Sequence, residues 1–204
     1  MRALDAAFLE HLAQARDEGL APVWFAWFRP LDRETLQRVD FGLWSGDEDI
    51  SLAVPRPEGG TQQRTYVGGC GLSVSGLKYV GDLSDQPVTV TISQLADAAQ
   101  VLVRGYDVRM AYCEIHATSM VGGDFVSAPQ LLWVGVVDEG PISTPSVDGE
   151  GGINLTVRDE LIALLATPNP AKSSHAHQIS RQAGDQFSRY SSVVGSRDVQ
   201  WYQG

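Results

Sequence analysis

Val88-Thr89-Val90-Thr91-Ile92-Ser93 is the stretch that decides the fold class of this chain. Valine and isoleucine alternate there with threonine and serine, and successive side chains of a β-strand point to opposite faces of the sheet. The pattern therefore predicts a strand with one apolar and one polar face. A second stretch, Ile153-Asn154-Leu155-Thr156-Val157, repeats the alternation. We expect the apolar faces of both strands to line one β core.

Segments outside these two stretches complete a mainly β (α+β) pattern. Strand-like runs occur at residues 23–28, 39–44, 50–54, 64–67, 108–116 and 130–138. Pro30 follows the first run and is expected to end it, because proline cannot donate a hydrogen bond to a neighbouring strand. Apolar residues at helical spacing predict helices at residues 2–18, 95–103 and 159–165. The sequence thus favours a β-sandwich or β-barrel with flanking helices.

The charge balance narrows the possible partners of the chain. Its 204 residues include 25 acidic and 15 Lys or Arg side chains, for a net charge of −10. Such a surface repels nucleic acid and anionic membranes. No apolar run is long enough to insert across a bilayer, and the N-terminus lacks the pattern of a secretory signal. Two cysteines, Cys70 and Cys113, are too few for a disulfide framework, so we expect assembly in a reducing cytoplasm.

The composition changes near Thr167. Residues 167–204 contain two early prolines and carry a net charge of +2, whereas residues 1–166 carry −12. We therefore predict a β-rich domain at residues 1–166 and an extended C-terminal arm at residues 167–204. An arm with so few apolar side chains cannot close a core of its own.

Aromatic and arginine side chains of the arm predict an interface with another subunit. A fully extended chain covers roughly 3.3 Å per residue, so the arm could reach on the order of 100 Å, enough to cross a subunit. Aromatic residues and arginine dominate the hot spots of protein interfaces. The candidate interface residues are Phe187, Arg189, Tyr190 and Trp201. In the alternative hypothesis the arm folds back and Trp201 completes the core of its own domain.

The sequence contains only weak matches to the motifs of phosphate-binding loops and of catalytic nucleophiles. Gly68-Gly69-Cys70-Gly71 lacks the lysine and hydroxyl residue that follow the glycines of a P-loop, so a turn or bulge is the simpler interpretation. Cys113 and His116 resemble a thiol–imidazole pair. Residues three apart in a strand lie on opposite faces, however, so no direct hydrogen bond between them is expected. We interpret Cys113 as a buried structural cysteine and His116 as a histidine at the rim of the fold.

Metal-binding and glycosidase patterns are equally sparse. His175 and His177, with Asp185, supply at most three ligands in a polar segment. The acids of Asp47-Glu48-Asp49 could pair with another carboxylate in a glycosidase, yet they follow a Ser-Gly turn that is typical of a solvated loop. We therefore expect no catalytic residue, no cofactor and no metal, and a cell-wall hydrolase is only a third hypothesis.

Three tryptophans support an alternative function. Trp24, Trp27 and Trp44 could form a sugar-stacking platform, as in a β-sandwich module that binds carbohydrate or a receptor. The same residues lie within strand patterns, where aromatic side chains more often belong to the core.

The order of segments along most of the chain forms a pattern larger than any single motif. It begins with the opening helix and Trp24, and it continues through Leu43–Gly46, Ser75–Leu77, Pro87–Ser93, Gly105–Met110, Leu132–Asp138, Ile153–Val157, Gly184–Phe187 and Val199–Trp201. This order resembles the phage minor tail proteins similar to lambda protein L. It also resembles the N-terminal part of tail-tip hub proteins in siphophages and gene transfer agents.

The resemblance implies a tail-tube-like β-sandwich or barrel in the tail tip of a virion, assembled in the host cytoplasm. The implied partners are further copies of the chain in a ring, a trimer or else a hexamer, together with distal tail, hub and fibre proteins. DNA would pass through such a ring without specific binding, which suits an acidic body. The lambda-like relatives carry a C-terminal cysteine cluster for an iron–sulfur centre. This chain has no cysteine after Pro168, so the resemblance implies the scaffold without the cluster.

Overall fold

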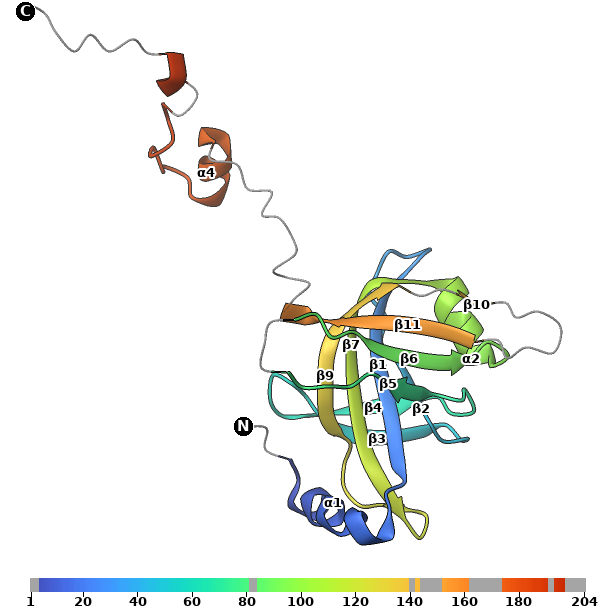
Figure 1. Ribbon diagram of the computed structural model, residues 1–204. Helices are drawn as coiled ribbons and strands as arrows, with labels where there is room; N and C mark the ends of the chain where they lie inside the picture. Colours follow the sequence, from blue (N-terminus) through green and yellow to red (C-terminus); the bar gives the residue numbers. More distant parts are fainter. Residues whose placement is uncertain are drawn as a thin grey trace, which may run out of the picture. The chain divides into compact units, whose positions relative to one another are not determined.

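A computed structural model of the chain describes residues 4–80, 84–139, 142–143, 152–161, 174–190 and 193–196 (Figure 1). The chain divides into two compact units, Met1–Ala166 and Thr167–Gly204, at the boundary where the composition changes. We call the first unit the body and the second the arm.

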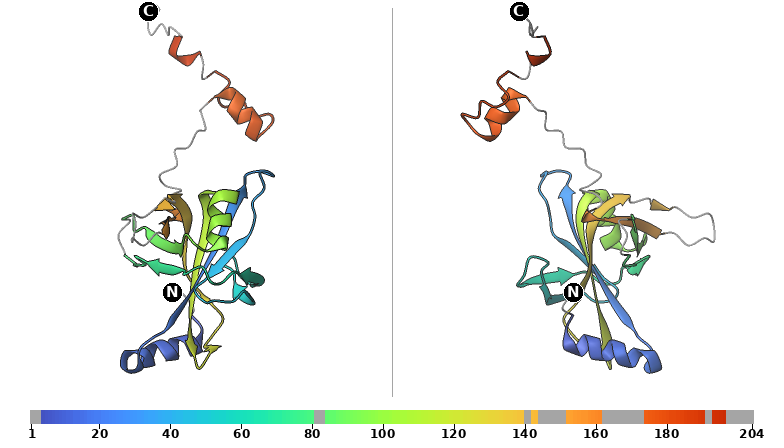
Figure 2. Two further views of the ribbon diagram at one scale, coloured as in Figure 1. Left: turned by 90° about the vertical axis from the view of Figure 1, so that its right-hand side faces the viewer. Right: turned by 60° about the vertical axis from the view of Figure 1, so that its left-hand side comes forward.

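The body is mainly β, and its main sheet curls into a half-barrel (Figure 2). The strand order is β2-β1-β7-β9-β11-β6-β5, with β8 paired to β7 and β10 to β11, while β3 and β4 form a separate hairpin. The strands are β1 (Pro22–Asp32), β2 (Phe41–Trp44), β3 (Ile50–Pro55), β4 (Thr61–Tyr66), β5 (Ser73–Ser75), β6 (Val88–Ser93), β7 (Tyr106–Val121), β8 (Asp124–Phe125), β9 (Gln130–Glu139), β10 (Ile142–Ser143) and β11 (Gly152–Asp159).

The concave face of the curled sheet holds the main apolar core. In the antiparallel β6–β11 pair, Val90 lies opposite Leu155, and the alternate residues on either side follow the same register. Every apolar residue of the two alternating stretches in β6 and β11 is fully buried. Burial of one such side chain contributes roughly 1.5–3 kcal/mol. The prediction that both strands line one core is confirmed.

The central strands β1 and β7 are buried on both faces. Ala26 and Phe28 of β1 face the main core, whereas Phe25 and Trp27 face a second cluster beneath the β3–β4 hairpin. The second cluster consists of Val23, Phe25, Trp27, Trp44, Val54 and Tyr66. A strand covered on both sides needs apolar residues at every position, which explains the unbroken apolar run at residues 23–28.

The segment between β4 and β5 connects the two edges of the curled sheet. Val67 bridges to Leu43 of the edge strand β2, and three residues later the carbonyl of Cys70 accepts a hydrogen bond from Ser93 at the end of β6. A side chain at Gly68 would meet backbone atoms of the 47–48 segment within 2.6 Å. The glycine-rich run is therefore a close-packed turn, as the sequence indicates.

Helix α1 (Ala6–Glu18) is fastened to the start of β9. The Asp5 carboxylate caps the helix by accepting hydrogen bonds from N–H groups of its first turn, and Gly19, at φ 85°, ends it. Phe8 is buried, and the backbone N–H of Asp5 donates to the side chain of Gln130. The helix predicted at residues 2–18 is confirmed from residue 6 onward.

Strand β1 continues past Pro30, so the predicted end of this strand is wrong. The strand runs to Asp32, and its register against β7 shifts between Arg29 and Leu31. Pro30 lies in this bulge, where the missing N–H removes no ladder hydrogen bond, and its carbonyl accepts a hydrogen bond from Val39.

The helix predicted at residues 95–103 begins two residues later than predicted and is not α-helical throughout. One turn of α-helix, α2 (Asp97–Gln100), passes into a wider π-helical turn, η1 (Val101–Gly105). Leu102 is buried, whereas Leu95 precedes the helix and is 86% exposed. Of the helix predicted at 159–165, residues beyond 161 lie outside the described part of the chain.

The described part of the arm contains a short helix, although the sequence predicts an extended segment. This helix, α4 (His175–Arg181), is capped by the Ser174 hydroxyl, and η2 (Val194–Ser196) is a single 3-10 turn. Across both units, the described residues include no helix that is long and apolar enough to cross a membrane.

Candidate functional site

A pocket of about 730 Å³ opens on the body between β4 of the hairpin and strands β1, β7 and β9. Charged side chains of both signs dominate its wall. Four are arginines and four are carboxylates: Arg29, Arg38, Arg56 and Arg64, with Asp40, Glu58, Glu114 and Glu160. This concentration of guanidinium groups stands out on a chain whose net charge is −10.

The floor of the pocket is a buried ion pair between Arg64 of β4 and Glu114 of β7. Two hydrogen bonds join them, from Nη1 to Oε2 at 2.6 Å and from Nη2 to Oε1 at 3.1 Å. The guanidinium also lies 4.6 Å from the ring centroid of Trp27. Bidentate pairs of this kind are directional, and breaking a buried pair is costly because one charge is left alone. The pair therefore locks the hairpin onto the main sheet.

Arg64 and Glu114 face each other because alternate side chains of a strand point to the same face. Along β4, Arg64 and Tyr66 face the sheet, while Thr65 between them is exposed. Along β7, Glu114 and His116 face the hairpin, and Cys113 faces the main core. Desolvation opposes the charged form of Arg64, but the hydrogen bonds and negative charge of Glu114 outweigh it and raise the pKa of the guanidinium.

His116 lies beneath this pair and is fully buried, so its predicted place at the rim is wrong. Its Nε2 lies 3.4 Å from Oε2 of Glu114, and the backbone of Pro55 in the hairpin also interacts with the ring. Burial, followed by the positive charge of Arg64, lowers the pKa of His116 to about 3, so the ring is neutral near pH 7. The ring is buried because the hairpin covers this face of β7, which the pattern of β7 alone does not reveal.

Cys113 does not form a nucleophilic pair with His116. It is buried on the opposite face of β7, as the sequence predicts. Burial, with a contribution from the charge of Glu114, raises the pKa of the Cys113 thiol. A protonated thiol that has no imidazole beside it is a poor nucleophile.

The rim of the pocket contains two exposed ion pairs and two side chains without an opposite charge. Arg29 pairs with Asp40 at 3.2 Å, and Arg56 pairs with Glu58 at 2.9 Å. Arg38 donates a hydrogen bond to the carbonyl of Arg29 and has no carboxylate partner among the described residues. Glu160 likewise has no cationic partner in the described part of the chain, although its charge acts on nearby Tyr112.

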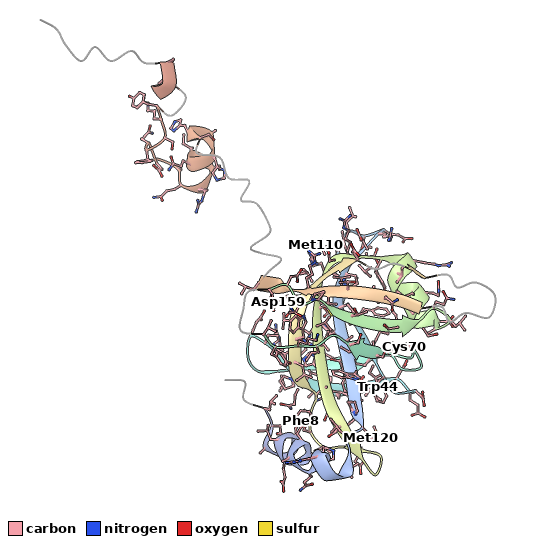
Figure 3. The ribbon with its side chains drawn as sticks, viewed as in Figure 1. Phe8, Trp44, Cys70, Met110, Met120 and Asp159 are labelled. Carbon is pink, nitrogen blue, oxygen red and sulfur yellow. The ribbon has the colours of Figure 1, made fainter. Side chains whose placement is uncertain are left out.

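Met110 adds an exposed apolar group to this rim. It is 52% exposed, and its φ of 58° lies in the left-handed region that residues other than glycine rarely adopt. Figure 3 shows Met110 and Asp159, the residue before Glu160, at one end of the body, whereas Phe8 and Met120 lie at the opposite end. The strained backbone therefore presents an apolar side chain to solvent beside the charged rim.

The sequence-predicted acids and tryptophans do not form a site. Asp49 accepts a hydrogen bond from the backbone of Gly68, and the indole of Trp44 donates to the carbonyl of Glu48, so the acidic loop supports the fold. Trp27 and Trp44 are buried, and Trp24 packs against the main core. The buried rings of Trp27 and Trp44 are covered by protein, whereas Trp24 is only partly buried, so the three rings do not form one exposed platform.

The candidate interface residues of the arm are exposed where the structure describes them. Phe187 is 89% exposed and Tyr190 is 63% exposed. The guanidinium of Arg189 lies 5.7 Å from the ring centroid of Tyr190. Trp201 lies outside the described residues.

His175 and His177 lie on α4, where they and Asp185 do not converge on a metal site. Within the described ranges, no group of three or more His, Cys, Asp or Glu side chains is placed to hold a metal ion.

The pocket and its ion pair were not predicted from the sequence, although a signal was present. Arg64 occupies an inward position of a strand with Tyr66 two residues later, and Glu114 stands in an otherwise apolar stretch of β7. Charged residues at such positions are rarely buried without a partner.

Neither the comparison of the sequence with protein-family models nor the comparison with curated proteins finds a match.

Proposed function

We propose that this chain is a structural subunit of a phage-type tail tip. In this role it forms a homo-oligomeric ring around the DNA path, a trimer or a hexamer, and links the distal tail to hub and fibre proteins. The body supplies the wall of the ring in a tail-tube-like arrangement, and the arm binds a neighbouring copy. The function is one of assembly, without a catalytic step.

The exposure of the arm's apolar residues is the observation that carries this proposal. Of the described arm residues with described burial, only Ser188 is buried, and α4 has no buried residue. Phe187, Tyr190, Val193 and Ile179 are between 39% and 89% exposed. Aromatic side chains exposed to this extent on one short segment mark a surface that another protein covers.

The body supports the same role in two ways. Among its buried polar groups, Arg64 and Glu114 pair with each other and brace the hairpin, which is a role in the fold. Its charge of −12, on residues 1–166, disfavours retention of DNA that passes nearby. The order of segments that resembles tail-tip proteins gives these general features a specific context.

Mass and symmetry test the proposal. Native mass spectrometry and negative-stain electron microscopy of the particle that contains the chain should show three or six copies in a closed ring beside tail proteins. A chain that remains a monomer or dimer and binds glycans saturably would instead be a recognition module, and the proposal would be wrong.

A further inference from the structure

We infer that the charged pocket of the body is the acceptor for the Phe187–Tyr190 segment of a second copy of this chain. The inference rests on the proposed ring, since it names the surface that one copy presents to the arm of the next. The pocket belongs to the body and the segment to the arm, so a repeated contact of this kind is heterologous, which is the type that closes rings.

The pocket offers groups that its own neighbours leave unmatched. Glu160 has no cationic partner and Arg38 no carboxylate partner among the residues that the structure describes. Met110 presents an apolar side chain that is 52% exposed at a strained backbone position. A position of this type persists only where the surrounding structure enforces it, and it often serves a contact. A partner could therefore add a cation beside Glu160, an aromatic ring or an anion beside Arg38, and an apolar group that covers Met110.

The arm segment supplies the matching groups within four residues. Arg189 is a cation with no carboxylate partner in the described part of the chain, and it lies against Tyr190. Phe187 is the most exposed of the large hydrophobic side chains described. Tyrosine and arginine are among the residue types most enriched in interface hot spots.

Charge and chemistry fix which groups pair. The guanidinium of Arg189 matches the carboxylate of Glu160, and an aromatic ring of Phe187 or Tyr190 can cover Met110 and stack on the Arg38 guanidinium. The other charges of the pocket are already paired with each other. The matching partner therefore carries one cation and an aromatic group, and it is not a polyanion.

Charge reversal in the full-length protein tests the pairing. Glu160→Arg or Arg189→Glu alone should weaken self-association by about tenfold or more, because each change places like charges together. The double variant should recover most of the wild-type association constant. Sedimentation velocity over a concentration series measures these constants, and a thermal melt of each variant shows that the body remains folded. Glu160→Gln gives a second test that does not introduce a larger cation.

Two matched controls identify the surface. Glu139→Arg reverses an exposed acid outside the pocket, and Arg181→Glu reverses an exposed arginine on α4. Both should leave association unchanged. If Arg189→Glu disrupts the ring but Glu160 variants do not, or if the double variant shows no recovery, the arm docks elsewhere and this inference is wrong while the ring stands. A wild-type chain that stays monomeric at every concentration overturns both.

Discussion

The body and the arm differ in the burial of their apolar residues. The body buries the apolar faces of the neighbouring strands β6 and β11 completely in one core, and it covers both faces of β1 and β7. The described part of the arm leaves Phe187 almost fully exposed and buries only Ser188. Folding free energy comes mainly from apolar burial, so the body can stabilise itself, whereas the arm depends on a surface supplied from outside. Changes in the body should therefore alter unfolding, and changes in the arm should alter assembly.

The largest effect is expected from a charge in the main core. Val90→Asp would place an unpaired carboxylate among fully buried side chains, which costs several kcal/mol, so the protein should fail to fold. Thr91→Asp is the matched control, because Thr91 is only half-buried and lies beside Asn154, to which it donates a hydrogen bond. Circular dichroism and solubility compare the two. A folded Val90→Asp protein together with an unfolded Thr91→Asp protein would invert the register of β6.

Breaking the buried ion pair should come next in size. Arg64→Met leaves the Glu114 carboxylate alone beneath the hairpin, and we expect a loss of about 3–5 kcal/mol. Arg56→Met, in the exposed pair with Glu58, should cost about 0.5 kcal/mol or less. Urea unfolding measures both variants. Equal losses for the two would show that the hairpin is not held by the buried pair.

A smaller, pH-dependent effect is expected at His116. Its pKa is about 3 in the folded protein and near 6.5 when unfolded, so below about pH 6.5 the unfolded chain binds a proton that the folded chain does not. Stability should be complete above pH 6.5 and fall by up to about 1.4 kcal/mol per pH unit as the pH drops toward 4. His116→Gln should remove this part of the slope, and the control His11→Gln, a change on helix α1 far from β7 in the sequence, should retain it. An unchanged slope in His116→Gln would mean that the ring is not buried in neutral form.

Phe187 should have the smallest effect on unfolding. Phe187→Ser removes an 89% exposed side chain, so the melting temperature of the dissociated protein should stay within experimental error. The same change should weaken self-association, which light scattering can follow. If the melting temperature falls by several degrees instead, Phe187 belongs to the core of its own chain, and the contrast between body and arm disappears.

The alternating strands were predictable from the sequence because a strand with one buried face alternates apolar and polar residues along the chain. β6 and β11 show this, because their apolar residues alternate with polar ones and are all buried. The strand end at Pro30 was not predictable, because a proline in a bulge and a proline after a strand look alike. The charged pocket was also missed. Its floor joins Arg64 and Glu114, which are 50 residues apart, and only the folded chain brings the hairpin over β7.

The most direct test of the central claim is a chain that ends at Thr167. We predict that it folds with the melting temperature of the full-length body, remains monomeric in sedimentation velocity, and no longer enters a ring. An insoluble or unfolded product would contradict this account, because it would show that the arm completes the core of its own body.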